Sequence, residues 1–132
     1  MEHQSFEVAT TDRFTDLTDR VRTFVADAGD GAVTVFLPHA TAGVAIFELR
    51  AGTEPDLSDT IDRLVPRDDR WTHRHGSPGH GADHVLPAFI APSMTIPVLD
   101  GRPLLGTWQS VVLVDTNVDN RVRTVHLTFL AG

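Results

Sequence analysis

The chain has 132 residues, 18 of them acidic and 11 basic, for a net charge of −7. Cysteine, lysine and tyrosine are absent, which excludes disulfides, thiolate ligands, Schiff-base lysines, a P-loop lysine and phenolic acids or bases. The acidic balance argues against non-specific nucleic-acid binding, which needs a basic surface. This length suits one domain, spanning residues 1–132.

Targeting and membrane signals are not expected in this chain. No apolar run approaches the roughly 18 residues that a membrane span needs. The N-terminal stretch MEHQSFEVATTDRF lacks the basic and apolar regions of a signal peptide. We therefore expect a cytoplasmic protein that binds neither membrane nor nucleic acid.

The first half of the chain alternates between strand and helix patterns. Three segments have the apolar pattern of strands: residues 6–10, 33–37 and 44–47. Thr15 is a candidate N-cap for a helix with apolar residues at helical spacing, which ends at Gly29. Residues 54–65 predict a second amphipathic helix, closed by Pro66.

Residues 66–81 have no periodicity. Their sequence, PRDDRWTHRHGSPGHG, is polar, rich in Gly and Pro, and loaded with His. Long irregular loops inside small domains are usually functional or disordered. A short helical piece is expected after this loop, over residues 82–90.

The C-terminal part is predicted to be β-structure. Its expected strands are residues 94–99, 104–114 and 123–130. The Asp100-Gly101 dipeptide between apolar runs predicts a hairpin turn. We expect an α+β fold, with a mostly antiparallel sheet or sandwich and two or three flanking helices.

Five of the seven histidines lie between residues 39 and 84: His39, His73, His75, His80 and His84. Neutral imidazole is the commonest protein ligand for metals such as zinc. His39 follows a predicted strand, His73 lies in the long loop and His84 begins the short helix, so three elements could meet around one ion. The spacing matches no local metal motif, and the alternative is a set of surface histidines without a ligand.

Glu48 is the first candidate for proton transfer. It directly follows the apolar strand 44–47, where a carboxylate is costly unless it is paired, ligating or catalytic. A general base and a metal ligand are both possible there. The alternative is a helix cap or an ion pair with Arg50 or Arg70.

The remaining candidates lie in the C-terminal β-structure. Gln109 stands among apolar residues, where a buried amide needs a partner, and Trp108 is expected in the core. Arg121 and Arg123 could clamp a phosphate. The alternative for these arginines is an ion pair with nearby aspartates.

Several segments in this order resemble one known family. They are PH-A-T-AG at 38–43, EPDLSD at 54–59, RLVP at 63–66, W-T-H at 71–73, A-D-H at 82–84, IPV-x-DG at 96–101, LLGTWQ at 104–109 and the closing NRVRTV. Together they are similar to the YjbQ-like family of small proteins, often classed as secondary thiamine-phosphate synthases. The resemblance runs from about Ser5 to Gly132.

This resemblance implies a compact α+β fold that assembles as a homotrimer, and it implies a set of site residues. The implied metal ligands are His39, His73 and His84. The implied catalytic residues are Glu48, Gln109 and Arg121. The implied substrate-binding residues are Thr41, Asp59 and Asp115. His75 and His80 have no clear counterpart, and His80 stands where many members carry Asn.

Two classes of function follow. The first is a metal-dependent enzyme that, by the family's label, joins a pyrimidine diphosphate to a thiazole phosphate and releases pyrophosphate. Three imidazoles leave an open position on zinc; magnesium is the alternative for a diphosphate substrate. Without lysine or a Gly-rich phosphate loop, this chemistry is expected to be incidental, and metal-assisted hydrolysis of a small substrate fits better. The second class is a non-catalytic module that binds a metal or small ligand.

Overall fold

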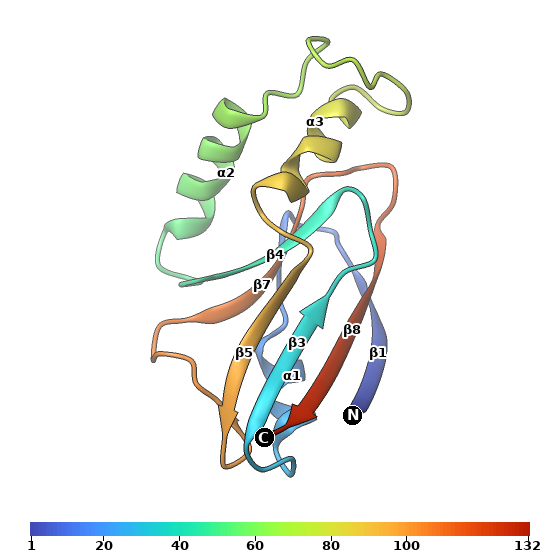
Figure 1. The fold of residues 1–132 in the computed structure, drawn as a ribbon. Coiled ribbons are helices and arrows are strands. Elements are labelled where there is room, and N and C mark those ends of the chain that lie inside the picture. Colours follow the sequence, from blue (N-terminus) through green and yellow to red (C-terminus); the bar gives the residue numbers. More distant parts are fainter.

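A computed structural model, which describes residues 1–132, contains two antiparallel sheets, three α-helices and one 3₁₀ turn (Figure 1). The elements in chain order are β1 (Glu2–Ala9), β2 (Phe14–Asp16), α1 (Thr18–Val25), β3 (Gly31–Phe36), β4 (Ala42–Phe47), α2 (Thr53–Leu64), α3 (His80–Val85), η1 (Leu86–Ala88), β5 (Ser93–Leu99), β6 (Arg102–Pro103), β7 (Ser110–Asp115) and β8 (Val122–Ala131). One sheet has the order β1-β8-β3-β5-β6, and the other has the order β2-β7-β4. The predicted α+β class is therefore confirmed.

The main core lies between the two sheets. Val33 and Val35 of β3 and Leu127 of β8 are fully buried on the inner face of the large sheet. Leu113 of β7 faces them from the small sheet, and Val21 of α1 packs into the same cluster. Alternating side chains along each strand thus turn one apolar face inward.

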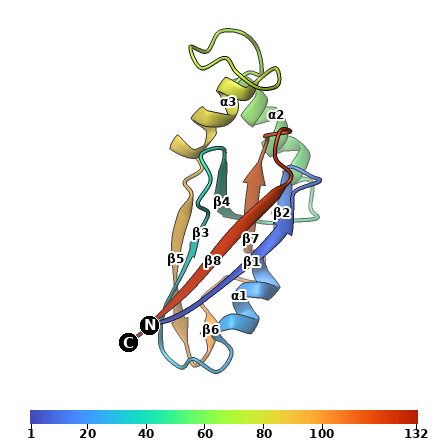
Figure 2. The ribbon, with the colours of Figure 1, turned by 90° about the vertical axis from the view of Figure 1, so that its right-hand side faces the viewer.

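A second, smaller core covers the other face of the three-stranded sheet. Val114 of β7 packs there with Ile61 of α2, with Val65 directly after that helix, and with Ala82 and Leu86 from the α3–η1 segment. Figure 2 shows α2 and α3 at the same end of the molecule, opposite to the end where the two chain termini lie. None of the helices is long and apolar enough to cross a membrane.

The first helix begins later than predicted. Phe14–Asp16 pairs with β7 as a short strand, so Thr15 is extended and does not cap the helix. Asp16 takes over part of that role, because its Oδ1 accepts hydrogen bonds from the Thr18 backbone N–H at 2.9 Å and from the Thr18 hydroxyl at 2.6 Å. Tertiary pairing therefore overrides the local capping signal.

The predicted strand 104–114 is wrong over its first six residues. Residues 104–109 form a turn, in which the Gln109 side-chain oxygen accepts a hydrogen bond from the Gly106 N–H at 2.8 Å. Trp108 is 73% exposed rather than in the core. The Asp100-Gly101 turn is confirmed: both residues have positive φ, 50° and 68°, as a tight hairpin requires.

Candidate metal centre

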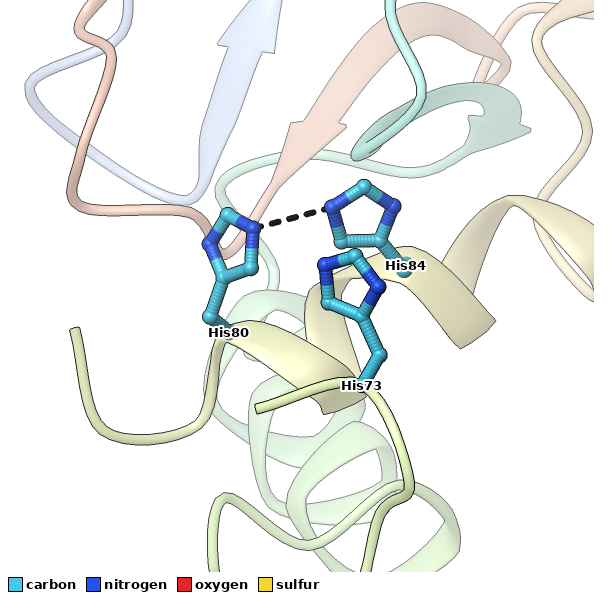
Figure 3. A group of neighbouring side chains, drawn as sticks. All are labelled: His73, His80 and His84. Atoms are coloured by element: carbon cyan, nitrogen blue, oxygen red, sulfur yellow. Dashed lines mark hydrogen bonds between the residues drawn. The ribbon is translucent and has the colours of Figure 1, made fainter. Parts of the chain in front are cut away.

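Three imidazoles gather at the end of the molecule beside α3 (Figure 3). One ring nitrogen from each of His73, His80 and His84 lies within 4.8 Å of the other two. The Nε2 atoms of His80 and His84 are 2.9 Å apart. His73 lies in a loop, and His80 and His84 lie on α3. The cluster is therefore formed by two neighbouring segments of the chain.

The helix α3 sets the spacing of two of these rings. His80 and His84 are four residues apart, which places them on the same helix face one turn from each other. The helix starts after Gly79, whose φ of 86° lies in the left-handed region. A Cβ at this position would also stand 2.7 Å from the Arg67 Cβ, so glycine is required there on both counts.

The third ring is brought in by close packing of the loop on α3. A Cβ on Gly81 would lie 2.5 Å from the Trp71 Cβ and closer still to the His73 carbonyl oxygen. Trp71 is itself held by a hydrogen bond from its indole N–H to the Pro66 carbonyl at 2.7 Å. Glycine at 81 thus lets the segment that carries His73 lie directly on the helix.

The electrostatics of the cluster favour neutral rings. Loss of water around the rings, and then repulsion from the neighbouring imidazoles, lowers the pKa of both His73 and His84. Neutral imidazole is the form that binds a metal. An adjoining cavity of about 190 Å³ has no hydrophobic side chain in its lining, which includes Arg74 as well as Asp68 and Asp69. The Asp68 carboxylate is paired with Arg70.

The donor set fits zinc. Zinc-bound imidazole nitrogens lie about 2.0–2.1 Å from the ion, so two nitrogens in a tetrahedral site are about 3.3 Å apart. The separation of 2.9 Å between His80 and His84, and the 4.8 Å limit for the whole group, require only small side-chain movements to reach that geometry. Magnesium prefers oxygen ligands in an octahedral arrangement, and three imidazoles do not match it.

His39, expected as a ligand together with His73 and His84, does not lie in this group within one chain. Its Nε2 accepts a hydrogen bond from the Thr124 backbone N–H at 2.8 Å, and its Nδ1 lies 3.5 Å from an Arg123 nitrogen. The ring is therefore engaged with β8. His80 supplies the third imidazole in its place.

Thr41 and Asp115, two of the expected substrate-binding residues, accept hydrogen bonds from the buried Arg123. Arg123 donates from Nε to Asp115 at 2.6 Å and from Nη2 to the Thr41 hydroxyl at 2.8 Å. All three residues are buried. Their polar groups satisfy one another inside the protein.

Glu48 and Gln109 lie at the opposite end of the small sheet. Residues Phe47 and Ser110 pair at one end of the β4–β7 ladder, whereas Ala42 and Asp115 pair at the other. The five residue steps from Ala42 to Phe47 separate these ends by roughly 17 Å. Glu48 lines a different cavity, of about 360 Å³, beside Trp108; the expectation that Glu48 faces the histidines is therefore not met within one chain.

The last two expected site residues are also apart from the histidines. Asp59 is exposed on α2. Arg121 is exposed and lines a cavity of about 220 Å³ next to Asp115 and Asn117. Neither has a side-chain hydrogen bond in this structure, so both are free to contact a ligand.

Sequence reasoning missed the part played by His80, and with it a polar network behind the ring. Asn117 donates to the buried Asp83 at 3.0 Å, and Asp83 also pairs with Arg67 and accepts from Thr116 at 2.7 Å. The i,i+4 spacing of His80 and His84 in the sequence indicates that the two rings lie on one helix face. The network joins α3 to the β7–β8 loop, and no local pattern in the sequence predicts such a contact.

Comparisons with known proteins agree with the fold. The family model described as UPF0047 protein YjbQ-like matches residues 2–132. The UPF0047 protein Rv2556c of Mycobacterium tuberculosis (strain H37Rv) is 63% identical over 120 residues, covering 91% of this chain and 90% of that protein. A crystal structure of the hypothetical protein APE1520 from Aeropyrum pernix K1 matches with a TM-score of 0.88 at 32% identity over all of both chains. That of a YbjQ-like protein of unknown function from Sulfolobus solfataricus P2 matches with a TM-score of 0.91 at 23% identity, over 99% of this chain and 97% of the other.

Proposed function

The chain belongs to the YjbQ-like UPF0047 family, and on that premise we propose that it binds one divalent metal ion, zinc in the first place, through His73, His80 and His84. The observation that carries this proposal is the convergence of three imidazole nitrogens within 4.8 Å. Surface histidines without a ligand gain nothing from such proximity, because each ring that protonates repels the others.

We propose further that the ion serves metal-assisted chemistry on a small substrate. Three protein ligands leave a tetrahedral ion one open position, where zinc polarises a bound group or lowers the pKa of water. The substrate would enter through the polar cavity of about 190 Å³ beside the rings. Thiamine-phosphate synthase activity stays a prediction from the family's label, and hydrolysis of a small ester is the alternative reaction.

A second candidate, a non-catalytic metal-binding module, is favoured by His75. The centroid of its ring lies 4.2 Å from that of His73 and 4.6 Å from that of His80. A fourth imidazole that reached the ion would fill its open position, and closed four-ligand sites are typical of structural zinc. The two candidates therefore differ in whether His75 binds the ion.

One assay separates the candidates. The purified protein, metal-free and loaded with zinc or magnesium, is tested on phosphate esters and diphosphates beside a His75→Ala variant. Catalysis predicts zinc-dependent turnover that is lost in His84→Ala and kept in His75→Ala. A binding module predicts no turnover in any form, with weaker zinc binding in His75→Ala.

A further inference from the structure

Asp119 reaches the histidine cluster from the loop between β7 and β8. One of its carboxylate oxygens, Oδ2, lies 3.0 Å from Nδ1 of His80 and accepts a hydrogen bond from the Ser77 backbone N–H at 3.1 Å. The other oxygen accepts a hydrogen bond from the Ser77 hydroxyl. The carboxylate thus contacts the ring from the side opposite to its metal-facing Nε2.

These contacts fix which nitrogen of His80 carries the proton. An aspartate carboxylate is ionised at neutral pH and only accepts hydrogen bonds, and both oxygens of Asp119 accept one from Ser77. The His80 Nδ1 must therefore donate. The Asn117 amide nitrogen, 3.3 Å from the same Nδ1, is also a donor and instead serves Asp83.

The proton on Nδ1 determines the state of Nε2, the other ring nitrogen of His80. With the proton on Nδ1, Nε2 of His80 carries a free lone pair, and this atom is the one that lies 2.9 Å from His84 Nε2. A carboxylate behind a ligating histidine holds the ring in one tautomer and orientation and raises its basicity. Neither His73 nor His84 has a carboxylate within hydrogen-bond distance, so His80 is the only ring of the three held in this way.

We propose that Asp119 is the positioning residue of the site, which prepares His80 as a ligand for ions that prefer imidazole. The part of this proposal that concerns the metal rests on the proposed function. The competing role for Asp119 is a purely structural tie between two loops through Ser77. A variant that removes the Ser77 hydroxyl weakens that tie and leaves the contact with His80.

The test compares Asp119→Ala, Asp119→Asn and Ser77→Ala with Asp69→Ala as the matched control. Asp69 is an exposed aspartate that lines the same cavity and has no side-chain hydrogen bond. The tautomer of His80 is read from imidazole ¹H–¹⁵N spectra of the metal-free proteins. Zinc affinity and the ligand-field spectrum of the cobalt-substituted proteins are measured in parallel.

We expect the Nδ1–H tautomer in the wild type, Ser77→Ala and Asp69→Ala. In Asp119→Ala the tautomer should change, and zinc affinity should fall about 10–100-fold with an altered cobalt spectrum. Asp119→Asn, which still accepts a hydrogen bond, should recover part of that loss. An unchanged tautomer in Asp119→Ala, or the same change in Ser77→Ala, would overturn the proposal. A wild type that binds no zinc would overturn the proposed function alone, because the tautomer is measured without metal.

Discussion

The ion pair between Arg123 and Asp115 holds two charges away from water. Both side chains are at most 4% exposed, and the Arg123 Nε lies 2.6 Å from the carboxylate. Removal of one partner leaves the other charge buried and uncompensated, which costs far more than a surface ion pair contributes. The same arginine reaches Thr41, so the pair also ties the segment directly before β4 to β8.

Substitution of Asp115 tests this account of the interior. We expect Asp115→Ala to lower the free energy of unfolding by about 3–5 kcal/mol, measured by urea denaturation. Asp19→Ala, at a fully exposed carboxylate on α1, is the control and should change it by no more than about 0.5 kcal/mol. Equal effects of the two substitutions would show that the buried pair is not a structural element.

The surroundings of His39 favour its neutral form. Burial, and then the charge of Arg123, lowers its pKa below the usual 6.5, although Asp115 acts in the opposite direction and His126 adds a small repulsion. The ring also accepts a hydrogen bond at Nε2, which the neutral form alone can do. His39 is therefore neutral in the folded protein at pH 7.

The lowered pKa of His39 makes the stability of the folded protein depend on pH. The unfolded chain takes up a proton at His39 near pH 6.5, before the folded protein does, so stability falls as the pH drops from about 6.5 toward the folded pKa. An NMR titration should place the pKa of His39 below 6.5. Between pH 7 and 5 the stability of His39→Gln should fall less steeply than that of the wild type. A pKa above 6.5 contradicts this account.

At the scale of elements, the close packing of the His73 loop on α3 decides the geometry of the metal centre. The only side chain small enough at position 81 is that of glycine. An added methyl group must push Trp71 and the His73 backbone away from α3, because backbone atoms have no rotamer with which to yield.

Gly81→Ala is therefore expected to weaken zinc binding at least tenfold and to lower the free energy of unfolding by about 1–3 kcal/mol. Gly106→Ala is the matched control, because its Cβ would meet the Gln109 side chain at an ordinary 3.4 Å. Isothermal titration with zinc and thermal unfolding measure both effects. Unaltered zinc affinity in Gly81→Ala would mean that the loop does not need this contact.

The elements themselves were largely predictable, because alternation and helical spacing are local. The strands around Val33 and Leu127 follow from their own apolar patterns. Residues 104–109 were not predictable in this way, since an apolar run with Trp108 is as typical of a buried strand as of an exposed turn. The site depends on contacts between segments: His73 and His84 lie close together, whereas His39 turns toward β8 through a hydrogen bond with a distant backbone N–H.

At the scale of the whole molecule, several apolar side chains lack a partner within one chain. Phe36, Val122 and Leu130 are exposed on the five-stranded sheet, and Leu130 is 63% exposed. Trp108 is exposed beside Glu48, far from the histidines. An assembly would bury such surface.

We expect a homotrimer, as the resemblance to the family implies. Light scattering should give three times the chain mass of 14.4 kDa. Leu130→Arg should shift the protein toward the monomer if the five-stranded sheet forms the interface, whereas Leu64→Arg, at an exposed leucine on α2, is the control and should not. A monomeric wild type at micromolar concentration would contradict the trimer.

The central claim is that His73, His80 and His84 together hold one metal ion. Its most direct test is the zinc content of the protein after equilibrium dialysis, measured by mass spectrometry. His126→Ala is the control, because His126 and His3 form another close pair, with ring nitrogens 2.8 Å apart on the large sheet. We expect one zinc per chain in the wild type and in His126→Ala, and a loss of that zinc in His84→Ala. A wild type without stoichiometric zinc, or a His84→Ala variant that keeps it, would contradict the claim.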